Sequence, residues 1–226
     1  MLTQKQVDET LKTIAGMFPE AHCELNHTSA LELTIAVMLS AQCTDALVNR
    51  VTPALFQKYH DPEDYLAVPL EELEGDIRSI GLYHNKARHI RQMCEKLIGN
   101  YGGRVPETQE ELLSLPGIGR KTANVILSVA FGVPALAVDT HVERVAKRLG
   151  ICRWKDSVRE VEETLMRRVP RERWSQTHHQ LIFFGRYHCR AQHPACLTCP
   201  LLACCREGQK RMKNKGQRGT LRISEY

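Results

Sequence analysis

Nine cysteines occur among the 226 residues, and five of them fall within one short segment near the C-terminal end. Four of these have the spacing Cys189-x6-Cys196-x2-Cys199-x5-Cys205. Zinc sites usually have two close pairs, whereas one close pair flanked by longer arms suits a loop around a four-cornered iron–sulfur cluster. His188 and His193 keep zinc as the alternative, and spacing alone does not exclude Cys204 as a ligand.

A second chemical pattern is the segment LPGIGRKT at residues 115–122. It lacks the glycines of a P-loop and no strand pattern precedes it, which excludes that kind of nucleotide site. We expect a tight turn between two helices, in which Gly117 and Gly119 let the backbone approach a ligand closely. N–H groups at the start of the second helix could then hold a phosphate oxygen. An ordinary helix–helix turn is the alternative.

Two residues nearby could do covalent and acid–base chemistry. Lys121 falls in the first turn of the predicted helix, where the dipole, Arg120 and partial burial all favour a neutral, nucleophilic amine. An exposed lysine that contacts phosphate is the alternative. Eighteen residues later, Asp139 stands where a helix cap belongs, and its carboxylate could also take a proton or balance a developing cation.

Composition and charge limit the class of protein. Hydrophobic residues make up 42% and charged residues 25%, which excludes disordered and fibrous proteins. The longest apolar stretch is interrupted by polar residues, Gly and Pro, and the N-terminus lacks a secretion signal, so we expect no membrane span and a cytoplasmic location. Residues 186–226 hold nine Lys or Arg and two acids, a net charge of +7, which leaves −2 on residues 1–185. Such asymmetry indicates a polyanion partner, with nucleic acid as the first candidate, and a solvated basic tail is the alternative.

Apolar residues recur at helical spacing almost throughout, and alternating strand patterns are almost absent, so the predicted fold class is all-α. Val7, Leu11 and Ile14 form one stripe, and the apolar run 31–39 predicts a buried helix. Ser157 and Glu160 fit a capping box.

Three segments, in this order and spacing, closely resemble the endonuclease III family, iron–sulfur DNA glycosylases of the helix-hairpin-helix superfamily. They are LPGIGRKTA (115–123), VDTHVERVAKRLG (138–150) and the four-cysteine loop. LSAQCTD (39–45) and GLYHNKA (81–87) extend the resemblance, which runs from about residue 3 to residue 207.

The resemblance implies two helical domains with a DNA cleft between them. The first is a six-helix domain with the helix-hairpin-helix at residues 21–133, and the second is a cluster domain made of residues 1–20 and 134–207. The basic segment 208–226 lies outside the resemblance, and its polarity predicts a mobile tail.

The resemblance also implies roles for individual residues. Lys121 matches the catalytic lysine that attacks C1′ of the damaged nucleotide, and Asp139 matches the catalytic aspartate. Gln42 and Leu82 match residues that fill the hole left when the target nucleotide swings out. The implied hairpin contacts with DNA come from Gly117, Ile118, Gly119 and Arg120. The implied ligands of a 4Fe–4S cluster are Cys189, Cys196, Cys199 and Cys205.

We therefore expect a monomeric repair enzyme associated with the nucleoid, whose partner is double-stranded DNA containing a damaged pyrimidine or an abasic site. It would remove oxidised pyrimidines through a lysine Schiff base and then cleave the abasic site by β-elimination. One alternative is a relative that removes adenine opposite oxidised guanine, which lacks a lysine at the position of Lys121. The other is a non-catalytic DNA-binding module, which would leave Lys121 and Asp139 unexplained.

Overall fold

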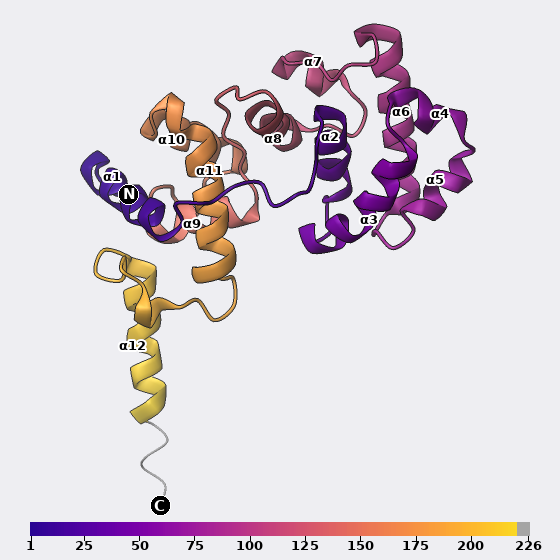
Figure 1. Ribbon diagram of the computed structural model, residues 1–226. Coiled ribbons are helices and arrows are strands. Elements are labelled where there is room, and N and C mark those ends of the chain that lie inside the picture. The colour runs from indigo at the N-terminus through magenta and orange to yellow at the C-terminus, as the bar shows by residue number, and fades with distance from the viewer. Residues whose placement is uncertain (221–226) are drawn as a thin grey trace, which may run out of the picture. The chain divides into compact units, whose positions relative to one another are not determined.

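The computed structural model describes residues 1–220, with side chains described as far as Lys213 (Figure 1). All regular elements in that part of the chain are helices, which confirms the all-α prediction. The chain divides into two compact units. Unit 1 comprises Met1–His22 and the chain from Val138 onward, and unit 2 comprises Cys23–Ala137. Every helix between residues 1 and 220 is too short or too polar to cross a bilayer.

Unit 2 contains seven helices, one more than the six-helix domain that the family resemblance implies. They are α2 (Ala30–Leu39), α3 (Asp45–Lys58), α4 (Pro62–Ala67), α5 (Leu70–Asp76), α6 (Tyr83–Tyr101), α7 (Gln109–Ser114) and α8 (Arg120–Ala130). Helices α4 and α5 are separated by two residues, Val68 and Pro69. Pro69 disfavours a helical conformation of the preceding Val68, whose φ is −100° and ψ 155°, and α4 ends there.

Helix α2 forms the centre of unit 2. The seven residues Leu33–Leu39 are all buried, which confirms the buried helix predicted from the apolar run 31–39. Helices α3, α6 and α8 pack around it (Figure 1). A helix buried on all sides has its last carbonyl groups away from water, so these groups need donors from the protein.

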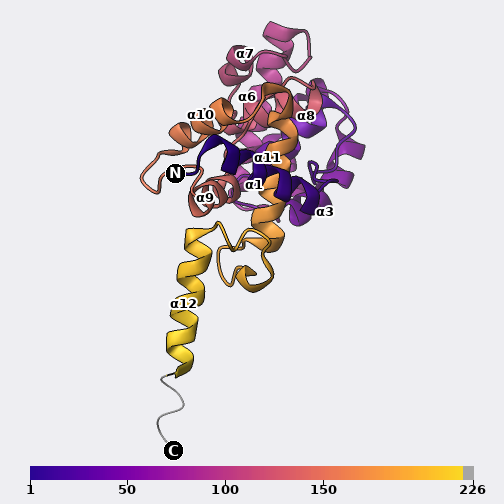
Figure 2. The same ribbon diagram turned by 90° about the vertical axis from the view of Figure 1, so that its left-hand side faces the viewer.

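Unit 1 is built from both ends of the chain. Its elements are α1 (Gln4–Met17), α9 (Thr140–Leu149), α10 (Val158–Arg168), η1 (Arg171–Arg173), α11 (Trp174–Phe183), η2 (Phe184–His188), η3 (Cys196–Thr198) and α12 (Arg206–Thr220). The predicted stripe of α1 is buried and α1 packs against α11 (Figure 2). The predicted capping box of Ser157 and Glu160 begins α10.

The two units divide after His22 and after Ala137, against predicted boundaries after residues 20 and 133. Before the second boundary, Asn124 Nδ2 donates to the carbonyl oxygen of Leu136 at 2.9 Å. Ala135 and Ala137 are buried in the core of unit 2.

The segment from residue 208, for which the sequence predicts a mobile tail, continues α12 as far as Thr220. Its first turns are attached to the preceding loop. Gln209 Nε2 donates to the carbonyl oxygen of Ala203 at 2.6 Å, and Arg211 pairs with Glu207 at 2.7 Å. The remainder of the expected tail, residues 221–226, lies outside the described residues.

Candidate active site and metal centre

The glycine segment forms the expected turn between α7 and α8, and its two glycines have different tasks. Gly117 has φ +78°, and a Cβ there would lie 2.9 Å from both His89 Cβ and Met38 Cε. Gly119 precedes α8 with φ −96°, and a Cβ there would meet nothing within 4 Å. Gly117 is therefore required by the turn itself, whereas Gly119 leaves open space beside the backbone at the start of α8.

Ile118 holds the turn against the core through its buried side chain and a backbone hydrogen bond. Its side chain is 6% exposed, and its N–H donates to the carbonyl oxygen of Leu115 at 3.2 Å. That N–H is used within the turn, so it does not remain for a phosphate. Arg120, at the first position of α8, is exposed.

Lys121 occupies the second position of α8, in the first helical turn, as predicted. Its side chain is exposed, whereas the sequence predicted partial burial. An exposed amine beside the open backbone of Gly119 is accessible to a large ligand from solvent.

Asp139 caps helix α9, as its position predicted. Its Oδ1 accepts hydrogen bonds from the backbone N–H groups of His141 at 2.9 Å and of Val142 at 2.8 Å. Both bonds use the same oxygen, so the cap occupies one of the two carboxylate oxygens. The cap also fixes the direction of the carboxylate relative to the axis of α9.

Gln42 and Leu82 share an unusual backbone conformation. Their φ angles are 55° and 61°, and among the non-glycine residues of the described chain only His193 also has a positive φ. Gln42 is exposed, and the Leu82 side chain is 55% exposed although it is large and apolar. Strained backbone of this kind persists where the surrounding structure enforces it, and it occurs most often at functional sites.

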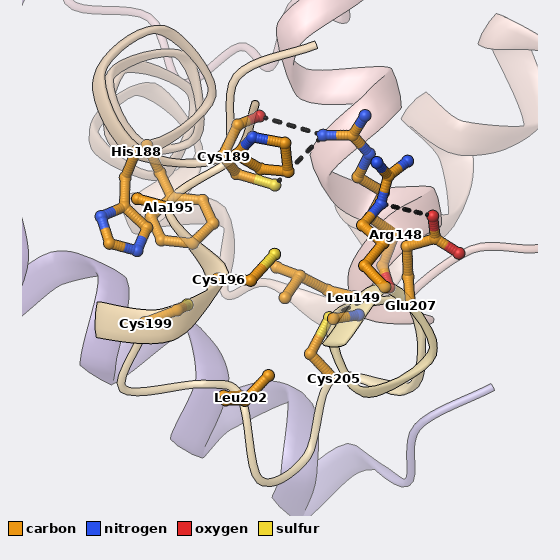
Figure 3. A pocket seen from close by; sticks show the side chains of 14 residues that line it. Arg148, Leu149, His188, Cys189, Ala195, Cys196, Cys199, Leu202, Cys205 and Glu207 are labelled. Atoms are coloured by element: carbon orange, nitrogen blue, oxygen red, sulfur yellow. Dashed lines mark hydrogen bonds and ion pairs between the residues drawn. The ribbon is translucent and has the colours of Figure 1, made fainter. Parts of the chain in front are cut away.

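The four predicted cysteine ligands line one cavity in unit 1 (Figure 3). The side chains of Cys189 and Cys196 point toward one another across it. Cys204 is absent from the lining of this cavity: it is exposed, and its Sγ lies 3.2 Å from the carbonyl oxygen of Leu201. The described residues contain no group of three or more His, Cys, Asp or Glu side chains close enough together to hold a single ion.

The sequence and structure were compared with known proteins. The sequence model of the HhH-GPD superfamily of base excision DNA repair proteins matches residues 35–171. Endonuclease III of Bacillus subtilis is 69% identical over 213 residues, which cover 94% of this chain and 97% of that protein. The chain belongs to the endonuclease III family.

Solved structures of the endonuclease III family agree with this assignment. A trapped endonuclease III–DNA covalent intermediate, in an estranged-adenine complex, is 67% identical, with a TM-score of 0.92 over 94% of this chain and 100% of that one. A non-covalent endonuclease III–DNA complex has the same identity and coverage, with a TM-score of 0.93.

Two hydrogen-bond donors approach cysteine sulfur atoms in the cavity of this endonuclease III family member. Arg148, on α9, is 8% exposed, and its guanidinium donates to the carbonyl oxygens of Arg190 at 2.7 Å and Ala191 at 2.9 Å. Arg148 Nη1 also lies 3.6 Å from Cys189 Sγ. The backbone N–H of Gly208 donates to Cys205 Sγ at 3.3 Å.

Two buried charged residues, Arg148 and Lys86, were missed by sequence reasoning. Lys86 is 6% exposed, on α6. A signal existed in both cases, since each residue continues the helical spacing of an apolar stripe. Lys86 precedes Ile90 by four positions, and Arg148 follows Val145 by three. A charged residue on the buried face of a predicted helix therefore marks a position to inspect for partners.

Proposed function

We propose that this chain is a DNA glycosylase and abasic-site lyase that removes oxidised pyrimidines from duplex DNA. The observation that carries the proposal is Lys121, an exposed amine in the first turn of α8, directly after the open backbone of the hairpin. A relative 67% identical has been captured as a covalent intermediate with DNA, which supports an amine nucleophile at this position.

The hairpin supplies the contact with the DNA backbone. The N–H groups at the start of α8 point along the helix axis toward solvent, where the dipole favours a phosphate. The open space at Gly119 allows a phosphate to come close to the chain. Arg120 adds a positive charge at the same position, so this interface holds duplex DNA without reading its sequence.

Access to a damaged base requires that the nucleotide leave the stack. Gln42 and Leu82 are proposed to occupy the space that the extruded nucleotide leaves, because both are exposed and held in strained turns that project their side chains. Oxidised pyrimidines unstack more easily than intact ones, which contributes to their selection.

The chemistry then uses Lys121 and Asp139 in different roles. The neutral amine of Lys121 forms a bond to C1′ while the bond from C1′ to the base breaks, and the sugar ring opens to a Schiff base. The imine acidifies the C2′ proton, whose removal expels the 3′ phosphate by β-elimination. The Asp139 carboxylate accepts a proton from the attacking amine or stabilises positive charge on the sugar, while one of its oxygens remains in the cap of α9.

We also propose that the cysteine cavity holds a 4Fe–4S cluster. Four thiols from separate parts of one loop line the cavity, and Arg148 Nε and His188 Nε2, which also belong to lining residues, are buried without a hydrogen-bond partner among the described residues. Burial raises the pKa of the Cys199 and Cys205 thiols, so metal binding there would release protons. When bound, the cluster supplies four iron–thiolate bonds that cross-link residues 189–205.

The experiment that tests the function is borohydride trapping on duplex DNA with an oxidised pyrimidine, using the purified full chain as a monomer. Wild type should yield a covalent protein–DNA product and strand cleavage together. Lys121→Gln should lose both, because both pass through the same adduct, and should still bind damaged DNA.

A matched control is Lys12→Gln, which removes an exposed lysine from α1 and should trap like wild type. Trapping that persists undiminished in Lys121→Gln would exclude Lys121 as the nucleophile. Base release by wild type without any trapping would instead indicate a glycosylase that uses water.

A further inference from the structure

The last carbonyl group of the buried helix α2 accepts a hydrogen bond from an ammonium group on another helix. Lys86 Nζ, on α6, donates to the carbonyl oxygen of Leu39 at 2.8 Å and to that of Ala41 at 2.7 Å. Leu39 is the last residue of α2, so this ammonium lies at the negative end of the helix dipole and satisfies carbonyl groups that have no partner within the helix.

The same lysine connects two turns that are far apart in the sequence. Ala41, which accepts from Nζ, is followed directly by Gln42 with its φ of 55°. The backbone N–H of Lys86 donates to the carbonyl oxygen of Leu82 at 3.1 Å, and Leu82 is the residue that caps the start of α6. One residue therefore bonds to the turn that carries Gln42 and to the turn that carries Leu82.

Burying the ammonium group of Lys86 costs hydration free energy, so a lysine at this position is expected to do more than fill space. Burial lowers the pKa of Lys86, and only the weaker influence of Cys43 opposes that shift. Methionine has a similar volume and could be buried there without the loss of hydration. What methionine cannot do is form hydrogen bonds to two carbonyl oxygens, and those bonds fix the position of the α2 end relative to α6.

We propose that Lys86 is a positioning residue that keeps Gln42 and Leu82 in one fixed arrangement for insertion into duplex DNA. The inference rests on the proposed function, in which these two side chains replace the extruded nucleotide. Two exposed side chains on separate loops can enter one gap in a base stack only if their separation is fixed before binding, since otherwise each binding event must order them. Lys86 provides this preorganisation without any contact with DNA.

The test compares two substrates that differ in their need for insertion. One is a duplex with an oxidised pyrimidine, and the other is a single strand with a preformed abasic site, whose aldehyde reacts with Lys121 without base extrusion. Lys86→Met should lower duplex excision by about tenfold or more, the size expected from losing hydrogen bonds to a charged group. It should leave borohydride trapping on the single strand unchanged. Lys86→Arg should restore part of the duplex activity, because a guanidinium can also donate to both carbonyl groups.

Lys58→Met is the matched control. Lys58 lies on α3 and also has two partners, Glu72 and Asp76, each at 2.7 Å, but it is a surface residue. It should behave like wild type on both substrates. Adding Lys86→Met to a double variant of Gln42→Ala and Leu82→Ala should not slow duplex excision further, because the lysine acts through the two residues that are already removed.

Equal losses on both substrates would overturn the inference and give Lys86 a general structural role. Full duplex activity in Lys86→Met would also overturn it. If Lys86→Met fails to fold, Lys86→Gln, which keeps an uncharged donor, takes its place in the same comparison. Absence of trapping by wild type on both substrates would contradict the proposed function itself, so the two failures are distinguishable.

Discussion

Gly117 and His89 approach each other so closely that a Cβ on Gly117 would lie 2.9 Å from the Cβ of His89. The φ of +78° at Gly117 adds a second restriction, since residues with a Cβ rarely adopt it. The hairpin turn can therefore lie against α6 only because Gly117 has no side chain. The neighbouring Gly119 has neither restriction, so the pair allows a direct comparison between a glycine that the fold needs and one at which we propose that DNA approaches the backbone.

The first prediction concerns the stability of variants at these two glycines. Gly117→Ala should lower the free energy of unfolding by about 2 kcal/mol or more, from left-handed strain together with the clash against His89. Gly119→Ala should lower it by less than about 1 kcal/mol, because alanine is only a poorer helix cap than glycine. Thermal or urea unfolding of the two variants measures the difference, and equal losses would contradict it.

The second prediction concerns DNA affinity at the same turn. Gly119→Ala places a methyl group in the open space beside the first amide groups of α8, so binding to undamaged duplex should weaken while the fold persists. Fluorescence anisotropy at fixed salt measures this affinity. Unchanged affinity in a folded Gly119→Ala protein would show that phosphate does not approach the backbone there.

The third prediction separates the two tasks of Asp139. Asp139→Asn keeps an oxygen that can accept from His141 and Val142, so stability should change by less than about 0.5 kcal/mol, whereas Asp139→Ala should lose about 1 kcal/mol. Base excision should fall by about 10²–10⁴-fold in both variants. Trapping on a preformed abasic site should fall less, because no base has to be expelled. Unchanged excision in Asp139→Asn would leave the aspartate as a cap only.

The fourth prediction distinguishes two adjacent cysteines. Cys205 lines the cavity and accepts from the Gly208 N–H, whereas Cys204 is exposed and lies outside the lining. Cys205→Ser should therefore lower the iron content and the absorbance near roughly 400 nm, and Cys204→Ser should leave both unchanged. The opposite result would move the ligand assignment by one residue, and zinc without iron in wild type would exclude the cluster.

Sequence periodicity predicted the features that depend on apolar spacing. The all-α class, the buried α2 and the cap at Asp139 follow from patterns within one helix or its first turn, and the structure confirms each of them. The glycine turn was predicted, but the different tasks of Gly117 and Gly119 were not. That difference depends on His89 and Met38, which come from other helices and leave no local signal in the sequence.

The features that sequence did not predict depend on polar contacts between distant segments. Unit 2 extends to Ala137, where Asn124 Nδ2 donates to the carbonyl oxygen of Leu136, and nothing near residue 133 indicates this contact. The partners of Lys86 could not be predicted because they lie 47 and 45 positions away along the chain. Gln42 and Leu82 were singled out only by family resemblance, whereas their strained backbone angles mark them independently.

The last prediction concerns the basic segment beyond the cysteine loop. Truncation after Glu207 removes the Gly208 N–H that bonds to Cys205 Sγ and the Gln209 contact with Ala203, so it should lower iron content. Truncation after Lys213 keeps those contacts and removes residues 214–226, which include three basic residues.

Truncation after Lys213 therefore separates the effect of lost positive charge from the effect of a changed cysteine loop. A chain ending at Lys213 lacks Lys215, Arg218 and Arg222, so its affinity for undamaged duplex should fall, and the slope of log affinity against log salt should decrease by up to about 0.9 for each phosphate that is no longer neutralised. Its iron content and its lesion turnover at saturating DNA should match wild type, because neither the cavity lining nor the hairpin is changed. Iron analysis, salt titrations of binding and single-turnover excision provide the three measurements. A loss of turnover at saturating DNA in this variant would place the end of the chain in the active site rather than in non-specific binding.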